Sequence, residues 1–502
     1  MLVLGYFFYG KFVERCFKPD NRLTPAVTKA DGIDYMVLPS WKIFMIQFLN
    51  IAGTGPIFGA IMGMWYGPEA YLWIVLGCIF AGSVHDYLAG MICLRNGGIG
   101  LPTLVGRYLG PNTKKVMLVF CMTLLIIVGA VFVLSPATLI ANDMPSGSFF
   151  SSLLFWIVCI FVYYILATML PVDKIIGKIY PLFAFSLIFM ALAIMGVLIF
   201  KWPSLLEIWD FESHKKIADL GIKMVDPIVP GLFITIACGA ISGFHATQSP
   251  MMARCMKSEK MGRPIFYGSM ITEGIVALIW ATASSWFFFE EGWREVCSPE
   301  MVAAFTGQSE KTLTQFFPAP VVVNEICRGW LGTFGGILAI FGVVAAPITS
   351  GDTALRSCRL IIADNLHIDQ RPIVKRLIVC LPVFLICIAL LVWQIDNPDS
   401  FNTIWKYFGW ANQTLAVFTL WAITVYLAHH RAPYIITLIP AVFMTAVSVS
   451  FIVGSPIAFN MPTSIVLFVT LIVVTFLIIR FRMWYSKKFR VVFKEPRSKK
   501  NN

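Results

Sequence analysis

Apolar runs recur along nearly the whole chain, from residue 41 to residue 483. Twelve of these runs are long enough to cross the roughly 30 Å hydrocarbon core of a membrane, and we number them spans 1 to 12. A shorter apolar stretch at Met1–Tyr9 predicts a short N-terminal helix before span 1. The pattern therefore predicts an all-α polytopic membrane protein with about 12 transmembrane helices. The approximate span bounds are 41–65, 70–94, 115–141, 149–171, 178–200, 229–249, 264–290, 328–350, 373–394, 402–428, 434–453 and 464–483.

Charged residues are distributed unevenly between the spans. Loops after even-numbered spans carry arginine, lysine or histidine, whereas loops after odd-numbered spans are acidic, mixed or uncharged. Arg95 follows span 2, Arg254 follows span 6, and Arg356 and Arg359 follow span 8. Because positive loops favour the cytoplasmic side, we expect both ends of the twelve-span set to lie inside the cell.

Composition narrows the class further. The 502 residues are 58% hydrophobic and 13% charged, whereas soluble domains have about 45–50% and about 25%. This excludes a soluble enzyme, a secreted disulfide scaffold and a nucleic-acid-binding domain. The sequence has no Gly-x-Ser-x-Gly, His-Glu-x-x-His or phosphate-binding motif, so we expect neither an enzyme nor a cofactor.

The net charge of +12 comes mostly from the C-terminal end. Residues 480–500 hold nine basic residues and one acidic residue, which leaves +8 in one segment. We expect residues 1–483 to form one transmembrane domain and residues 484–502 to form a basic cytoplasmic tail that meets anionic lipid, not nucleic acid. Cys297 and Cys327 fall on the predicted outer side, as a disulfide or as two unrelated thiols.

Two spans are interrupted near their middle. Span 1 contains Gly53-Thr54-Gly55-Pro56, and span 6 contains a Gly/Ser/His/Gln stretch over 239–250. Such residues open the helical hydrogen-bond ladder. Because spans 1 and 6 are five apart and run in opposite directions, they point to a transporter site between inverted repeats. The alternative is that the glycines only permit close helix packing.

The interruptions define the repeats and the candidate binding residues. We expect residues 41–200 and 229–428 to form the two five-helix repeats and residues 429–483 to form two peripheral helices. Polar or flexible residues at the breaks and in span 10 are the substrate-binding candidates, although Asn412 and Gln413 could instead bond between helices. The candidates are Asn50, Gly53, Thr54, Gly55, Gly243, Phe244, His245, Gln248, Asn412 and Gln413.

Ionisable side chains at membrane depth are few and are functional candidates by default. We expect His85, Asp86, Glu273 and Asp352 to couple transport to protons, with His245 placed in the break itself. An alternative for Asp86 is an ion pair with a nearby arginine, either that of residue 95 or that of residue 107. The alternative to proton coupling as a whole is coupling to sodium.

The sodium alternative uses oxygen atoms from two spans. Backbone carbonyls near Ala52 in span 1 could combine with the hydroxyls of Thr349 and Ser350 in span 8. The hydroxyls could instead bond back to their own helix.

Several motifs resemble the carbon starvation protein A (CstA) family. They are Asn50-Ile-Ala-Gly-Thr-Gly-Pro-Ile-Phe-Gly, the run from Leu72 to Tyr87 that ends in Ser-Val-His-Asp-Tyr, Arg95-Asn-Gly-Gly, Ser242-Gly-Phe-His-Ala-Thr-Gln-Ser-Pro and Ser350-Gly-Asp-Thr-Ala-Leu-Arg-Ser-Cys-Arg. The resemblance covers nearly the whole chain. It implies a LeuT-like five-plus-five inverted repeat in the bacterial inner membrane, with broken helices 1 and 6. The first helix of such proteins looks shortened here at Met1.

The resemblance also implies a function. We expect a secondary active importer of peptides, amino acids or a small carboxylate such as pyruvate, driven by protons and acting during carbon starvation. The sodium-coupled symporter is an alternative, and a channel or nutrient sensor belongs to a different class.

Overall fold

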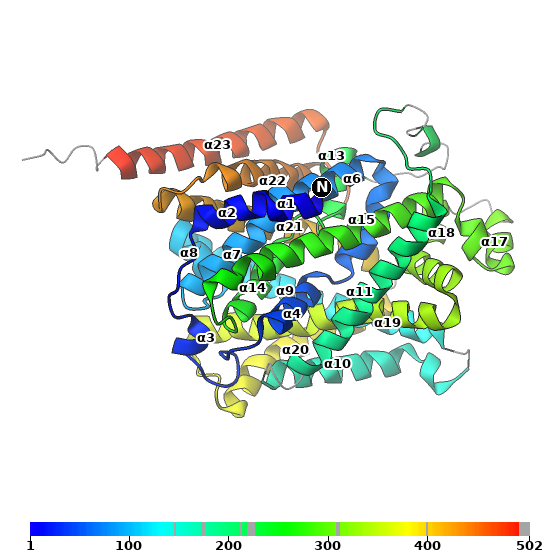
Figure 1. The fold of residues 1–502 in the computed structure, drawn as a ribbon, viewed down its shortest axis with the longest axis horizontal. Coiled ribbons are helices and arrows are strands. Elements are labelled where there is room, and N and C mark those ends of the chain that lie inside the picture. The colour runs from blue at the N-terminus through cyan, green and yellow to red at the C-terminus, as the bar shows by residue number, and fades with distance from the viewer. Residues whose placement is uncertain are drawn as a thin grey trace, which may run out of the picture.

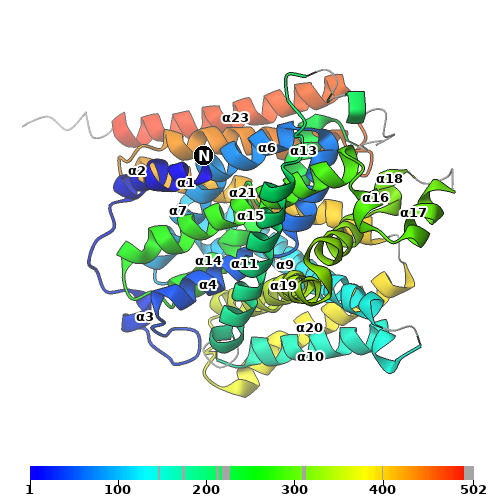
Figure 2. The ribbon, with the colours of Figure 1, turned by 45° about the vertical axis from the view of Figure 1, so that its right-hand side comes forward.

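The apolar runs fold into helices. The computed structural model describes every residue except 145, 146, 172–175, 211, 212, 214, 218–225, 308–311, 398, 399 and 491–502. Within that described part the secondary structure is helical and contains no strand. Many of the long helices run in the same general direction across the molecule, as Figures 1 and 2 show.

Each predicted span corresponds to helix in the described residues. Spans 1 and 6 are interrupted, and span 4 is the shorter apolar helix α10, Leu153–Met169. The other nine are single apolar segments of membrane length. They are Glu69–Arg95, Pro111–Ala141, Lys178–Lys201, Glu259–Phe289, Gly335–Leu366, Ile373–Asp396, Ile404–His429, Ile435–Gly454 and Thr463–Lys488. The predicted class, an all-helical polytopic membrane protein, is confirmed.

Several spans contain more than one helical element. The elements up to span 5 are α1 (Leu2–Phe7), α2 (Tyr9–Phe17), α3 (Pro25–Thr28), α4 (Ser40–Ile51), η1 (Gly55–Gly59), α5 (Ala60–Gly63), η2 (Met64–Tyr66), α6 (Glu69–Leu72), η3 (Trp73–Gly82), α7 (Ser83–Arg95), α8 (Leu101–Leu109), α9 (Pro111–Asp143), η4 (Phe149–Ser151), α10 and α11 (Ile176–Lys201). The later elements are α13 (Ile228–Thr235), α14 (Gly243–Ala253), η5 (Glu259–Met261), η6 (Arg263–Tyr267), α15 (Gly268–Phe289), α16 (Trp293–Val296), α17 (Pro299–Thr306), α18 (Leu313–Phe316), α19 (Ala319–Leu366), α20 (Ile373–Asp396), α21 (Ser400–His429), α22 (Ile435–Gly454) and α23 (Thr463–Arg490).

Both predicted breaks are present, and they lie against each other. Span 1 bends by 52° between α4 and the helical segment Gly55–Tyr66. Span 6 is divided into α13 and α14 by residues 236–242. A Cβ atom on Gly55 would lie 2.4 Å from the Cβ of Cys238, so only glycine permits this approach. The two interruptions therefore form one joint at the centre of the bundle.

The predicted end of span 8 is wrong. The sequence pattern placed span 8 at 328–350, with Arg356 and Arg359 in the following loop, but the helix continues to Leu366 and buries both arginines. The guanidinium of Arg356 donates to the carbonyls of Ala167 and Leu170 at the end of α10. Satisfied in this way, the arginines do not end the helix.

The same arginines hold the segment before α4. Asp31 accepts hydrogen bonds from the backbone N–H groups of residues 33, 34 and 35, which turns the chain there. The turn places Asp34, 2% exposed, against Arg356 (3.1 Å) and Arg359 (2.9 Å). We call these three residues the Asp34 cluster. It ties the entry of the broken span 1 to α19, on the face predicted to be cytoplasmic.

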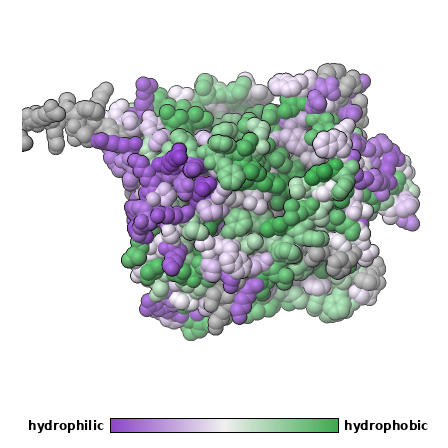
Figure 3. Space-filling view, viewed as in Figure 1, coloured by the Kyte–Doolittle hydropathy of each residue, from purple (hydrophilic) through white to green (hydrophobic). Residues whose placement is uncertain are grey.

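The remaining helices lie around the joint. The α22 and α23 helices pack beside each other along one edge (Figures 1 and 2), and much of the apolar surface of α23 is exposed, including Phe468 at 65%. Figure 3 shows apolar residues across the middle of one face and hydrophilic residues toward its left and right edges. Such a band suits a bilayer. The α23 helix continues through residues 484–490, and the rest of the predicted tail, 491–502, lies outside the described residues.

Candidate functional site

A buried group of four titratable side chains lies at the joint. Asp86 on α7 lies 2.8 Å from the Nδ1 of His85 and 2.8 Å from the Nδ1 of His245 on α14. The Nε2 of His245 lies 3.6 Å from a carboxylate oxygen of Glu273 on α15. All four side chains are 0% exposed. We call them the Asp86 group.

His85 and Asp86 contact each other although they are adjacent on a helix. Neighbouring side chains on a helix project about 100° apart, so this contact was not expected from the sequence. The alternative of an Asp86 ion pair with Arg95 is wrong, because Arg95 pairs with Glu259 at 2.9 Å. Arg107, the other arginine considered, donates to the side-chain carbonyl of Asn96.

Glu273 connects the Asp86 group to the unwound part of span 6. Its Oε1 accepts a hydrogen bond from the backbone N–H of Gly239 at 3.1 Å. The Sγ of Cys238, a nitrogen of His245 and an oxygen of Glu273 lie within 4.8 Å of one another, so the three donors could reach one metal ion. The Nε2 of His245 and the Oε2 of Glu273 face each other without a hydrogen-bond partner in the described residues.

A second set of polar groups lies unpaired on span 1. Asn50 and Thr54 were expected there, and Gln47 joins them one turn earlier on α4. Both amide atoms of Gln47, both amide atoms of Asn50 and the hydroxyl of Thr54 are buried without a hydrogen-bond partner among the described residues. A buried polar group left unpaired costs about 1–3 kcal/mol. The three side chains are therefore suited to a polar solute.

Sequence reasoning missed Gln47. It lies inside the apolar run of span 1, before the Gly-Pro signal that drew attention to residues 50–56. Its spacing of three residues from Asn50, within α4, is the helical signal that could have found it.

Other candidate residues hold the break in place. The Oδ1 of Asn412 accepts hydrogen bonds from the hydroxyl of Ser242 and the backbone N–H of Phe244, and so caps the start of α14 from another helix. The amide of Gln413 donates to the carbonyl of Phe233 at 2.7 Å. Gln248 accepts from the hydroxyl of Ser357 at 3.2 Å, which joins α14 to α19.

Gly243 lies directly against α21. A Cβ atom added to Gly243 would lie 2.2 Å from the backbone nitrogen of Ala416 and 2.4 Å from the carbonyl oxygen of Asn412. Backbone atoms cannot rotate away as side chains do, so Gly243→Ala is expected to destabilise the fold by about 1–3 kcal/mol. Thermal unfolding of the purified protein in detergent, followed by tryptophan fluorescence, measures this.

Gly196 supplies the matched control for that substitution. It lies on α11, and a Cβ there meets nothing within 4 Å. Gly196→Ala is expected to leave the unfolding temperature unchanged or slightly higher, because alanine favours helix. Equal unfolding temperatures for the two variants would contradict close packing at Gly243.

The sodium alternative involves atoms that converge in the structure. The hydroxyl of Ser350 lies 3.2 Å from the carbonyl oxygen of Leu49 and 3.3 Å from that of Asn50. The hydroxyl of Thr349 lies 3.5 Å from the same Leu49 oxygen. The converging carbonyls are thus those just before Ala52. The hydroxyl of Ser350 donates to these carbonyls. The hydroxyl of Thr349 donates at 2.9 Å to the carbonyl of Ala346 in its own helix, which is the back-bonding alternative.

Asp352 belongs to a separate group. The hydroxyl of Tyr180 on α11 donates to Asp352 and lies 2.8 Å from the carbonyl of Thr349. The second oxygen of Asp352 is buried without a hydrogen-bond partner in the described part of the chain.

Cys297 and Cys327, considered as a disulfide, are both free thiols.

Comparison with known proteins places this arrangement in a family. A sequence profile of the carbon starvation protein CstA family matches residues 1–155, 137–316 and 312–451. The chain belongs to the carbon starvation protein CstA family. The match includes both broken spans and the Asp86 group.

Three relatives illustrate the range of the CstA family. An uncharacterized membrane protein of Haemophilus influenzae is 44% identical over 330 residues, which cover 57% of this chain and 89% of that protein. Peptide transporter CstA of Campylobacter jejuni is 28% identical, over 88% of this chain and 77% of its own. Pyruvate/proton symporter BtsT of Escherichia coli is 27% identical, over 56% of this chain and 47% of its own.

Solved structures of transporters share the fold. A manganese transporter of Eremococcus coleocola has a TM-score of 0.52 at 12% identity, covering 92% of this chain and 99% of that one. MhsT in complex with L-phenylalanine has a TM-score of 0.52 at 14% identity, covering 81% and 92%. These likenesses confirm the LeuT-like fold of this CstA-family chain. Family and fold together identify a multi-pass membrane transporter.

Proposed function

We propose that this protein is a secondary active importer that moves peptides, amino acids or a small carboxylate such as pyruvate together with a proton. The named activities of two relatives, a peptide transporter and a pyruvate/proton symporter, support the substrate classes. The observation that carries the proposal is the buried contact of Asp86, His245 and Glu273 beside the broken span 6. Titratable groups at membrane depth mark proton relays, and broken helices mark the binding sites of transporters.

The proton step follows from the hydrogen bonds of the Asp86 group. An ionised Asp86 can only accept hydrogen bonds, so it favours the tautomers of His85 and His245 that carry hydrogen on Nδ1. The Nε2 of His245 is then the basic atom that faces Glu273. A proton bound at Nε2 makes an imidazolium held between two carboxylates. A proton bound by Glu273 instead leaves the imidazole neutral. Movement of one proton between these atoms therefore changes the charge on both sides of the contact.

The unpaired polar groups support a solute site at the joint. Asn50 and Thr54, with Gln47 added, offer donors and acceptors on span 1. The positive end of the α14 dipole favours a carboxylate near His245. We include in the site the backbone at the span 1 break, Gly53 and Gly55, and the start of α14, Gly243 and Phe244. Gln248, Asn412 and Gln413 bond to the neighbouring helices around it.

The cellular setting is part of the same proposal. We place the protein in the bacterial inner membrane, with the C-terminal tail 484–502 in the cytoplasm against anionic lipid and with import active during carbon starvation. Asp352 is proposed as a second proton-binding carboxylate, nearer α10 and α11 than the Asp86 group is.

Uptake into proteoliposomes tests the function. With an inward proton gradient of one pH unit, we expect about tenfold accumulation of solute for each proton carried. One proton moving down that gradient releases about 1.4 kcal/mol, which is the free energy needed for a tenfold concentration ratio. Labelled pyruvate, alanine and alanyl-alanine are the solutes, and a protonophore should abolish accumulation. EDTA should leave uptake unchanged, since the proposal needs no metal ion. Failure of all three solutes to accumulate under the gradient would contradict the proposal.

Sodium coupling is tested in the same vesicles. The observation that favours it is the convergence of the Thr349 and Ser350 hydroxyls on the carbonyls of Leu49 and Asn50. Sodium-independent uptake that survives Thr349→Ala would exclude it. Saturable uptake, with no single-channel currents, would distinguish a carrier from a channel.

A further inference from the structure

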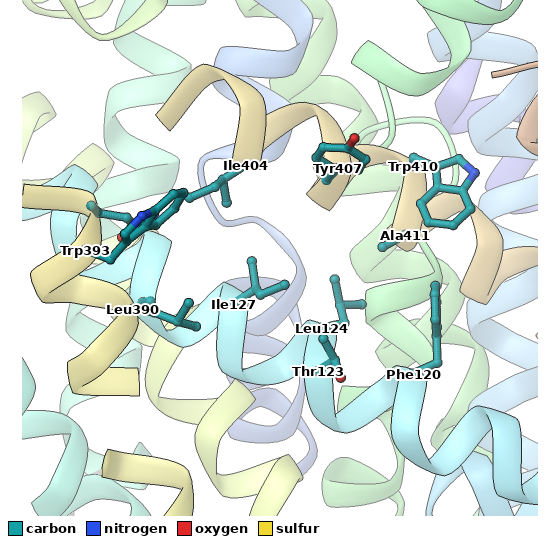
Figure 4. A pocket seen from close by; sticks show the side chains of 12 residues that line it. Phe120, Thr123, Leu124, Ile127, Leu390, Trp393, Ile404, Tyr407, Trp410 and Ala411 are labelled. Carbon is teal, nitrogen blue, oxygen red and sulfur yellow. The ribbon is translucent and has the colours of Figure 1, made fainter. Parts of the chain in front are cut away.

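A groove lies at the edge of the bundle, away from the joint. It has a volume of about 330 Å³ and lies between α9, α20 and α21 (Figure 4). Trp393 marks one end and Phe120 and Trp410 mark the other, with Leu124 and Ile127 along its floor. The groove is long and lined mainly by apolar side chains.

Tyr407 and Trp410 line the groove with their ring carbons, because their polar atoms bond elsewhere. The hydroxyl of Tyr407 donates to the carbonyl of Ile457, and the indole N–H of Trp410 donates to the carbonyl of Ser448. These polar atoms are therefore engaged with the connection after α22 and with α22 itself. An apolar occupant fits the rings that remain.

Gln394 is the exception among the lining residues. It is 3% exposed, and its Oε1 has no hydrogen-bond partner in the described residues. A side-chain amide both donates and accepts, and its burial without a partner is unfavourable. Because Oε1 can only accept, the occupant carries a hydrogen-bond donor at the Gln394 end. Because Gln394 lies close to Asp396, the last residue of α20, this end is near the membrane interface.

The groove opens toward lipid. Trp393 is 48% exposed and Tyr407 is 38% exposed, and aromatic residues of this kind mark the membrane interface. Neighbouring apolar residues of α20, such as Leu385 at 57%, are exposed along the same helix. The bilayer is thus the immediate source of an elongated apolar molecule.

We propose that the groove binds one acyl chain of an aminophospholipid such as phosphatidylethanolamine, with the lipid ammonium donating a hydrogen bond to the Oε1 of Gln394. The chain body lies along α9, between the aromatic ends. This site is separate from the solute site and does not depend on the proposed function.

The bound chain supports the helix that faces the joint. On α21, Trp405 contacts Phe58 of the broken span 1 at 6.3 Å between ring centroids, and Phe408 contacts Phe132 of α9 at 5.9 Å. Tyr407 and Trp410, on the same turns of α21, line the groove. The lipid chain therefore fills the space behind residues that pack against span 1.

Photo-crosslinking with the full-length protein in nanodiscs tests the site. The probe is phosphatidylethanolamine with a diazirine on one acyl chain, compared with phosphatidylcholine that carries the same diazirine and whose trimethylated ammonium cannot donate. We expect crosslinks from the phosphatidylethanolamine probe at residues of α9, α20 and α21 that line the groove. We expect the phosphatidylcholine probe to crosslink about two- to tenfold less, the worth of one hydrogen bond.

Three variants decide the outcome. Ala411→Trp fills the groove and is expected to reduce its crosslinks at least tenfold, whereas Leu385→Trp on the exposed face of α20 leaves them unchanged. Gln394→Leu is expected to remove the difference between the two probes, with the same elution profile as the wild-type protein. The site is overturned if groove crosslinks are missing in the wild type or persist in Ala411→Trp. The role of Gln394 is overturned if the wild type does not distinguish the two probes.

Discussion

Asp86→Asn is expected to abolish proton-driven accumulation. The substitution keeps the size of the side chain but removes the charge that holds His85 and His245, each at 2.8 Å. Without that charge an imidazolium at His245 loses one of its two carboxylate partners, and the proton no longer has a stable binding site. Under a one-unit pH gradient, accumulation should fall from about tenfold per proton to none.

Exchange of labelled for unlabelled solute is the control for Asp86→Asn. Exchange requires no net proton movement, so the variant should still exchange solute if the joint is intact. Glu259→Gln serves as the matched substitution, because Glu259 is an equally buried carboxylate that pairs with Arg95 outside the Asp86 group. Gradient-driven accumulation that persists in Asp86→Asn would rule out its role in coupling.

Asp34→Asn is expected to cause the largest loss of stability. It leaves Arg356 and Arg359, both buried, without their carboxylate. Removing one partner from a buried ion pair typically costs about 3–5 kcal/mol, because the remaining charge is not compensated. Thermal unfolding in detergent measures the loss. Asp20→Asn, which breaks an exposed pair with Arg22, should have no measurable effect.

The Asp34 cluster also predicts a pH dependence. Burial alone would raise the pKa of Asp34, but Arg359, Arg356 and Arg254 outweigh it and hold the pKa below its ordinary value. A carboxyl with a lowered pKa in the folded state stabilises the fold above its unfolded pKa of about 4. This contribution is lost as the pH falls through the lower folded value. The wild type should therefore lose stability in acid more steeply than Asp34→Asn, and parallel acid profiles would count against the cluster.

The helices and their breaks followed from local pattern. Long apolar runs must form hydrogen-bonded helices in a membrane, and Gly53 to Pro56 cannot continue one. The end of span 8 could not be predicted in this way. A charged arginine indicates a loop when the sequence does not show which residues it pairs with. Asp34 lies 322 residues from Arg356 in the sequence, so no local signal joins them.

The candidate site was predictable only in its parts. Each member of the Asp86 group stood out as a charge at membrane depth, yet the contact between Asp86 and His245 spans 159 residues. Gln47 was hidden by its apolar neighbours, and its unpaired amide is visible only once the surrounding helices are in place. Asn412 was open to two interpretations, and the structure shows it capping α14.

Gly55 and Cys238 pack so closely that the two unwound segments have no free space between them. Since even one added carbon would lie 2.4 Å from the Cys238 side chain, neither segment can advance without displacing the other. Movement of either segment toward the other would therefore displace both. In the proposed transport cycle, a solute that pushes one segment inward would pass that movement to the other by direct contact.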